Sequence, residues 1–167
     1  MKTQIGMVAR VGLMSAMAFL ATYFFRLPGP VANVYFHLGG AVIMTAAALF
    51  GKRGGMFVGA IASSLADLLL GAPVWAPFSF IIHGFEGYLV GALAEKPGKL
   101  PLIAGMCAGT AVMVIGYTAV AGCLYGAAAM PIEFFGDLFQ GGVGIAIAYP
   151  LTRILQRKSV VRKPSAN

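Results

Sequence analysis

The sequence predicts an all-α membrane protein, a bundle of six transmembrane helices with the N- and C-termini in the cytoplasm. Three observations lead to this prediction. Hydrophobic residues make up 59% of the 167 residues and charged residues only 10%, whereas soluble domains carry about 25% charged residues. The mean hydropathy is +0.86. The apolar residues also fall into six runs, each close to the roughly 17–25 residues with which a helix crosses the hydrocarbon core.

The six predicted helices follow one another along the chain, and Gly and Pro mark the breaks between them. They cover residues 5–25, 35–50, 56–72, 78–94, 101–122 and 132–154. The breaks read LPGP, GKRGG, GAPVWAP, EKPGK and MP, all typical of turns. Helices are favoured because lipid offers no partners for backbone N–H and C=O groups. We predict a single six-helix membrane domain over 1–158, followed by a basic cytoplasmic tail at 159–167.

The basic residues predict the orientation in the membrane. With the N-terminus inside, every Lys and Arg except Arg26 faces the cytoplasm, as the positive-inside rule requires. The net charge of +7 is therefore assigned to orientation in a lipid bilayer. No nucleic-acid partner is expected, because no helix carries a basic face.

Ionisable residues inside apolar segments are costly and are functional candidates by default. Four of the five acidic residues lie in such segments, namely Asp67, Glu86, Glu133 and Asp137, and His83 joins them. On the predicted topology all five lie in the outer half of the bilayer or near its centre. This distribution predicts a pocket open to the outside rather than a proton pathway across the membrane.

Helical spacing places the first candidate substrate-binding residues on two faces. His83 and Glu86 are three residues apart and share a face, with Ser79 one turn above. Asp137 and Gln140 share a face of the last helix. The alternative for each pair is a structural hydrogen bond between helices.

Aromatic and small residues complete the candidates. Trp75 and Tyr35 lie in outer loops or at helix ends, where a ring either covers a bound ligand or belongs to the interfacial aromatic belt. Gly12 and Ala16 form a small-xxx-small pair on the first helix, beside Ser15. Such residues let helices approach closely, either within the monomer or against a partner.

Several catalytic motifs are absent. The sequence contains no P-loop, no G-x-S-x-G, no H-E-x-x-H and no Cys/His metal-binding spacing. We therefore expect no cofactor, no metal and no nucleotide hydrolysis by a P-loop. Two alternatives stay open: a small intramembrane enzyme that uses His83 and Glu86, and a self-contained carrier, against which the lack of polar groups in the inner half counts.

Two segments resemble the substrate-binding S components of energy-coupling factor (ECF) vitamin transporters. Residues 49–93 resemble the family's run "G-x-x-x-G … D-L … G … P … I-I-K-G-x-E-G … G", and residues 130–155 resemble its ending "P … N-x-x-Q-G-x-x-G … P-L". The resemblance is greatest to the branch with hydroxymethylpyrimidine/pyridoxine-type and riboflavin-type subunits. The family often has Lys where this chain has His83, and Asn where it has Asp137.

The resemblance implies a non-enzymatic capture subunit of an importer, a multi-pass protein in the plasma membrane of a prokaryote. Such a subunit binds a vitamin or precursor from the outside and associates with a transmembrane T component and two ATPase subunits. Small residues on the first helix form the docking face in this family, which points to Gly12, Ser15 and Ala16. The expected substrate resembles hydroxymethylpyrimidine or pyridoxine, with riboflavin second.

Overall fold

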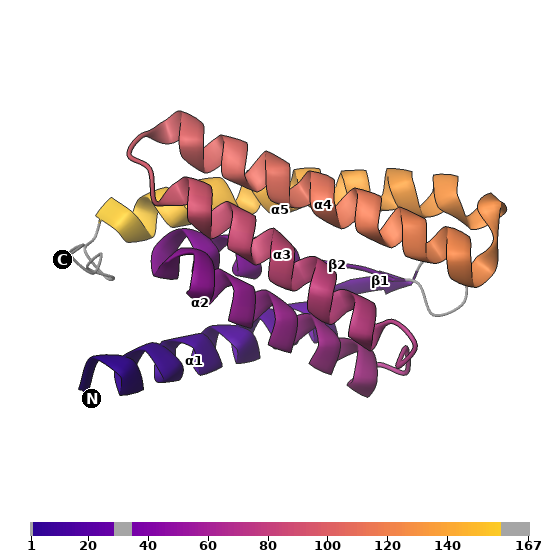
Figure 1. The fold of residues 1–167 in the computed structure, drawn as a ribbon, viewed down its shortest axis with the longest axis horizontal. Coiled ribbons are helices and arrows are strands. Elements are labelled where there is room, and N and C mark those ends of the chain that lie inside the picture. The colour runs from indigo at the N-terminus through magenta and orange to yellow at the C-terminus, as the bar shows by residue number, and fades with distance from the viewer. Residues whose placement is uncertain (1, 29–34, 158–167) are drawn as a thin grey trace.

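The computed structural model describes residues 2–28 and 35–157, except for the side chains of residues 2–4, 27, 28, 35 and 36. The predicted basic tail at 159–167 lies outside the described residues. Within them the chain is almost entirely helical (Figure 1). The elements are α1 (Lys2–Phe24), β1 (Arg26–Pro28), β2 (Tyr35–His37), α2 (Gly39–Leu69), α3 (Ala76–Ala94), α4 (Lys99–Tyr125), the short 3₁₀ helix η1 (Ala127–Ala129) and α5 (Met130–Arg157).

The element α2 folds back on itself at Gly51. Gly51 has φ 78° and ψ −177°, a conformation that glycine adopts without a steric penalty. A Cβ atom on Gly59 would lie 3.3 Å from the side chain of Ile43, whereas residues 16 apart in a straight helix are about 24 Å apart. The arms 39–50 and 52–69 therefore lie antiparallel. The predicted second and third helices form one element with a one-residue break, instead of two helices separated by a loop at 51–55.

The side chain of Glu95 supports this reversal. Its Oε1 accepts a hydrogen bond from the backbone N–H of Lys52 at 3.3 Å. The first N–H groups of a helix have no partner within the helix, so a carboxylate there stabilises the start of the second arm. Glu95, which follows α3, thus fastens the turn between the two arms of α2.

A short β-hairpin joins α1 to α2. Strands β1 and β2 are antiparallel, with Arg26 opposite His37 and Pro28 opposite Tyr35. The sequence prediction placed residues 35–38 in a helix, and this is wrong because α2 begins only at Gly39. Three-residue strands are too short to show a period of two, so their pairing depends on tertiary contacts.

Helices α2 and α3 pack backbone to backbone through glycines. A Cβ atom on Gly55 would lie 2.5 Å from the carbonyl oxygen of Gly87, and one on Gly91 would lie 2.5 Å from the carbonyl carbon of Gly51. Side chains at these positions would hold the two helices apart. Small residues at contacts between membrane helices let the two backbones approach closely. The close approach brings the polar residues of α3 into the interior.

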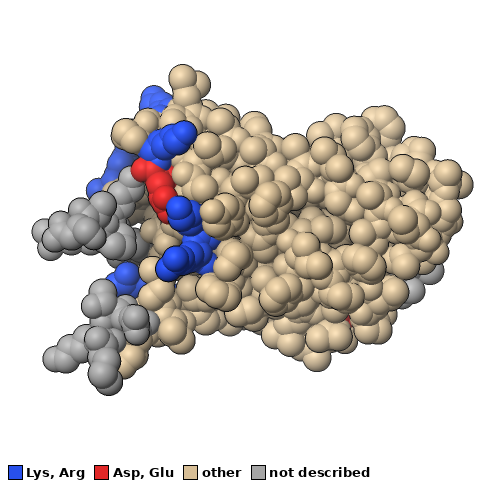
Figure 2. All heavy atoms as spheres, in the orientation of Figure 1, with Lys and Arg blue, Asp and Glu red and all other residues tan. Residues whose placement is uncertain are grey.

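The surface and the ends of the chain agree with a membrane environment. Four helical segments of the described chain are long and apolar enough to cross a membrane: Ile5–Phe24, Gly39–Leu69, Lys99–Tyr125 and Ala127–Arg157. On the face shown in Figure 2, Lys and Arg gather at one end of the molecule and the rest is almost free of charge. The start of α1 and the end of α5 lie at that same end (Figure 1).

Candidate functional site

The centre of the candidate site is a buried pair on α3. His83 and Glu86 are both 0% exposed, and the Nδ1 atom of His83 lies 2.5 Å from Oε2 of Glu86. Glycines of the neighbouring helices leave the space in which this pair is buried. A Cβ atom on Gly59 of α2 would strike the carbonyl oxygen of His83, and one on Gly109 of α4 would lie 3.0 Å from Cγ of Glu86. The predicted shared face of His83 and Glu86 is confirmed as geometry.

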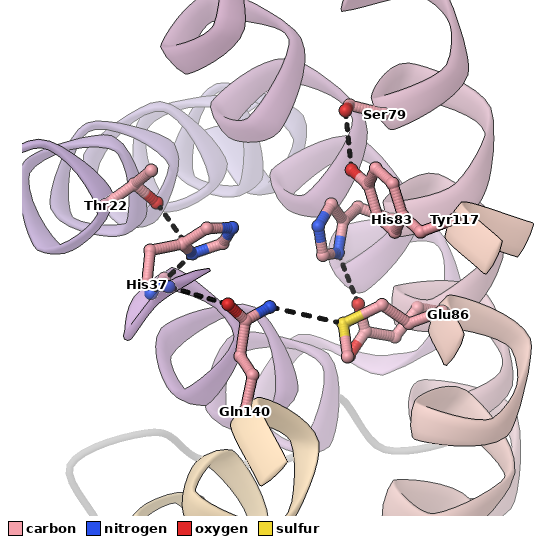
Figure 3. Close-up of polar contacts among 9 residues, drawn as sticks. Thr22, His37, Ser79, His83, Glu86, Tyr117 and Gln140 are labelled. Carbon is pink, nitrogen blue, oxygen red and sulfur yellow. Dashed lines mark hydrogen bonds and ion pairs between the residues drawn. The ribbon is translucent and has the colours of Figure 1, made fainter. Parts of the chain in front are cut away.

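The ring of His83 lies between two other rings. Its centroid is 5.8 Å from that of His37 and 5.4 Å from that of Tyr117. In Figure 3 the rings of His37, from β2, and His83, from α3, face each other. The hydroxyl of Tyr117, from α4, donates a hydrogen bond to Oγ of Ser79 at 2.5 Å. Ser79 therefore lies above the pair, as predicted, and holds Tyr117 in place.

Gln140 connects α5 to the hairpin. Its Oε1 accepts a hydrogen bond from the backbone N–H of His37 at 2.6 Å, and its Nε2 donates to Sδ of Met113 at 3.6 Å. A thioether is a weak acceptor, so the second contact leaves the amide N–H groups available to a better partner. Gln140 thus attaches the hairpin to a polar cluster inside the bundle. This cluster consists of His37 from β2, Ser79, His83 and Glu86 from α3, Tyr117 from α4 and Gln140 from α5.

His37 lies in β2, outside the membrane-spanning helices. Its Nδ1 accepts a hydrogen bond from the backbone N–H of Gly39 at 3.1 Å. Desolvation lowers the pKa of His37 to about 3, and the charge of His83 acts in the same direction. His37 is therefore neutral at physiological pH, with its ring proton on Nε2.

Asp137 brings a second carboxyl to the cluster. Asp137 is 4% exposed, and Glu133, one turn earlier on α5, is 6% exposed. The carboxyl of Asp137 lies close enough to those of Glu133 and Glu86 for electrostatic interaction. Asp137 and Gln140 are both buried in the bundle, as the shared face predicted.

Polar atoms in this region remain without a partner. Among the described residues, the buried atoms His83 Nε2, Glu86 Oε1, Asp137 Oδ2 and Thr110 Oγ1 make no hydrogen bond within the protein. Leaving a buried polar group unpaired costs about 1–3 kcal/mol. A bound molecule that reached these atoms could complete their hydrogen bonding.

Of the two aromatic candidates, Trp75 and Tyr35, the structure describes only the side chain of Trp75. Trp75 is 3% exposed, its indole N–H donates to the hydroxyl of Tyr125 at 3.2 Å, and its ring lies 5.5 Å from that of Tyr117. The ring of Tyr117 thus lies close to the rings of both Trp75 and His83. The side chain of Tyr35 lies outside the described part of the chain.

A groove on the surface adjoins the polar cluster. It has a volume of about 460 Å³ and is lined by Phe24, Phe25, Arg26, His37, Leu38, Phe139, Gln140 and Val143. His37 and Gln140 belong both to this groove and to the polar cluster.

Comparison with known proteins identifies the family to which this chain belongs. The sequence model described as "ECF-type riboflavin transporter, S component" matches residues 2–157. The chain belongs to this family. An S component is the substrate-capture subunit of an ECF importer rather than an enzyme. The predicted family and the predicted capture function are therefore confirmed.

Individual relatives agree with this assignment. The thiamine precursor transporter HmpT of Lactococcus lactis subsp. cremoris (strain MG1363) is 34% identical over 137 residues, which cover 82% of this chain and 78% of the relative. An uncharacterized protein in a gap 3′ region of Pyrococcus woesei is 37% identical over 140 residues, covering 83% of this chain and 94% of the relative.

A solved structure shares the fold. It is described as "Structure and mechanism of the S component of a bacterial ECF transporter" and superposes with a TM-score of 0.69. The match covers 92% of this chain and 99% of that chain, at 22% sequence identity. The predicted helical S-component architecture is thus confirmed at the level of the fold.

Sequence reasoning missed two residues of this S component's cluster, Tyr117 and His37. A tyrosine inside an apolar helix carries a hydroxyl that needs a partner, and this signal was present in the sequence. His37 was placed at the start of a helix, where nothing connected it to His83. Its position depends on the hairpin, which has no clear sequence signature.

Proposed function

We propose that this S component captures a small ring-shaped vitamin or precursor, of the hydroxymethylpyrimidine or pyridoxine class, with riboflavin as the second candidate. The observation that carries the proposal is the fully buried His83–Glu86 pair with its unpartnered Nε2 and Oε1 atoms. Binding sites for small molecules are mostly apolar, with a few convergent polar groups of this kind. The similarity to HmpT supports a thiamine precursor, and the family description supports riboflavin as the alternative.

The candidate residues take different parts in this proposal. Glu86 and Asp137 accept hydrogen bonds from the ligand, while His83 and Gln140 orient its ring. Ser79 positions Tyr117 through their hydrogen bond. Trp75 and Tyr35 are proposed as aromatic neighbours of the ligand, Trp75 acting through the ring of Tyr117.

The proposed arrangement in the membrane has six crossings, with both termini in the cytoplasm of a prokaryotic cell. The reversal of α2 at Gly51 supports an even number of crossings. The basic end of the molecule, where α1 starts and α5 ends, supports the orientation. The site then lies towards the outside, where a vitamin arrives.

We further propose that the T component, which acts with two ATPase subunits, docks in a groove between α1 and α2. The groove has a volume of about 880 Å³. Its lining is Met7, Val8, Val11, Gly12, Ser15, Ala16, Phe19, Arg53, Gly54, Phe57, Ile61 and Leu65. A Cβ atom on Gly12 would meet nothing within 4 Å, so this small-residue face is open rather than filled by the chain itself.

A Gly12→Leu substitution tests the docking proposal. It fills the groove without touching the ligand site, so we expect loss of co-purification with the T component and unchanged ligand affinity. Gly142→Leu, at another helical glycine with open space around it, is the matched control on α5. Full assembly of the Gly12→Leu variant would place the docking face elsewhere.

Substitution of Tyr117 tests whether the ligand contacts the ring beside His83. Tyr117→Phe keeps the ring and loses the hydrogen bond to Ser79, so we expect affinity to fall about threefold, in line with a net contribution of about 0.5–1.5 kcal/mol for one hydrogen bond. Tyr117→Ala removes the ring, and we expect a fall of at least tenfold. Titration calorimetry on the purified variants measures both, and equal affinity in all three proteins would remove Tyr117 from the site.

Reconstitution in liposomes tests the function as a whole. With the T component and ATPases present, we expect ATP-dependent accumulation of the ligand. The chain alone should bind the ligand without accumulating or altering it. Uptake by the chain alone would favour a self-contained carrier, and a chemically changed ligand would favour an intramembrane enzyme that uses His83 and Glu86.

A further inference from the structure

The groove between α1 and α2 presents apolar side chains at the surface of the bundle. Its lining residues Phe57, Ile61 and Leu65 on α2 are exposed, and so is Val8 on α1. The groove has a volume of about 880 Å³. In a bilayer, an apolar helix surface of this kind is covered either by lipid chains or by another protein.

The length of the groove matches one leaflet of a bilayer. On α1 the lining runs from Met7 to Phe19, and on α2 it runs from Arg53 to Leu65. Each stretch corresponds to about 18 Å of helix at about 1.5 Å per residue. One leaflet contributes about 15 Å, which is half of the hydrocarbon core. An acyl chain laid along the groove would therefore reach from the membrane surface to the midplane.

Arg53 adds a positive charge at one end of this groove. Among the described residues that line the groove it alone is charged. It is exposed and makes no ion pair with any residue that the structure describes. Arg53 follows the reversal of α2 at Gly51, at the end of the molecule where α1 begins and where Lys and Arg gather (Figures 1 and 2). On the proposed topology this end faces the cytoplasm, where anionic lipids give the leaflet a negative surface potential.

We propose that the groove holds one anionic phospholipid of the cytoplasmic leaflet while the subunit is free, and that the T component displaces this lipid when it docks. The acyl chain lies along α1 and α2, and the phosphate of the headgroup pairs with Arg53. The binding of the lipid does not depend on which vitamin is captured. Its displacement rests on the proposed docking of the T component in the same groove.

Ser15 gives the physical reason for the displacement. Its side chain lines the groove, is 6% exposed, and its Oγ makes no hydrogen bond with the described part of the chain. An acyl chain offers no polar atom to this hydroxyl, whereas a polar side chain of a docking helix does. Because an unpaired buried hydroxyl is unfavourable, the groove filled by lipid is less stable than the groove filled by such a helix.

Native mass spectrometry of the purified full chain tests the lipid site. The chain in mild detergent receives equal amounts of anionic phosphatidylglycerol and of phosphatidylcholine, which has no net charge, with identical acyl chains. We expect one phosphatidylglycerol per chain, retained with a preference of about fivefold. Arg53→Gln should abolish this preference. Arg157→Gln, at an exposed basic residue of α5 outside the groove, is the matched control and should keep it.

Two further measurements separate the acyl chain from the headgroup. Gly12→Leu fills the groove and should lose both lipids, whereas Gly142→Leu, where a Cβ atom likewise meets nothing within 4 Å, should retain them. Glycerol phosphate carries the anionic group without acyl chains, so it should leave the thermal midpoint unchanged while phosphatidylglycerol raises it. Equal stabilisation by the two compounds would indicate a simple anion site and overturn the lipid site.

The remaining outcomes distinguish this inference from the docking proposal. Equal retention of the two lipids, or an unchanged preference in a folded Arg53→Gln variant, would overturn the pairing of the phosphate with Arg53. A lipid-free dimer in the same spectra would show that a second copy of the chain fills the groove. We expect phosphatidylglycerol to slow assembly with the T component more than phosphatidylcholine does, and equal rates would overturn the displacement. Failure to assemble in either lipid would contradict docking and displacement together, while the lipid site would stand on the spectra of the free chain.

Discussion

Replacement of Glu86 by Gln is expected to weaken ligand binding at least tenfold, a loss of about 1.4 kcal/mol or more. The substitution keeps the size of the side chain and removes its charge. Glu86 is fully buried and contacts His83, and hydrogen bonds to a charged acceptor are about twice as strong as neutral ones. The substitution also replaces one carboxylate oxygen, an acceptor, by an amide NH₂ group, a donor. A ligand N–H group at that position would then face another donor.

The control for this variant is Glu95→Gln. Glu95 is exposed at the end of α3 and accepts a hydrogen bond from the backbone of Lys52 at the turn of α2. The Glu95→Gln variant should therefore bind the ligand with the same affinity as the unaltered chain. Titration calorimetry gives both affinities, and thermal unfolding in detergent shows whether each variant is folded. A folded Glu86→Gln variant with full affinity would show that Glu86 is not part of the binding site.

Replacement of Gly87 by Ala is expected to lower the thermal midpoint clearly and to weaken binding as well. A Cβ atom at this position would collide with the backbone carbonyl of Gly55, whose carbon would lie 2.5 Å away. Backbone atoms cannot rotate aside, so α2 and α3 must separate, and overpacking of this kind costs about 1–3 kcal/mol. Because Gly87 follows Glu86 directly, the separation also displaces the buried pair.

Gly142→Ala provides the matched comparison for Gly87→Ala. Gly142 lies on α5, where an added Cβ atom would meet nothing within 4 Å, so the same substitution should leave both the thermal midpoint and the affinity unchanged. Equal thermal midpoints for the two variants would mean that the close contact of α2 and α3 is not what holds the site in place.

Local sequence patterns predicted the helices because each depends on a long apolar run. The break near 51 was visible as a cluster of Gly and basic residues, although only Gly51 leaves the helical conformation. The hairpin at Arg26–Pro28 and Tyr35–His37 was not predicted. Its strands are too short for a periodic signal, and it is attached to the helices by a contact between residues 103 positions apart, His37 and Gln140.

Of the candidate site, the sequence could predict only contacts within one helix. The pairing of His83 with Glu86 follows from a spacing of three within one helix, and the structure places them in contact. The position of Tyr117 beside His83 depends on how α4 is rotated against α3, which no pattern within one helix determines. The roles of the candidate residues in binding remain predictions that the variants above test.

The most direct test of capture is to purify the chain alone in mild detergent and to identify by mass spectrometry any small molecule that remains bound. We predict a single vitamin or vitamin precursor, close to one molecule per chain, that is released unchanged on denaturation and is lost from the Glu86→Gln variant. A chain that retains nothing, and that no vitamin stabilises against heat, would contradict the proposal that this buried polar cluster is a capture site.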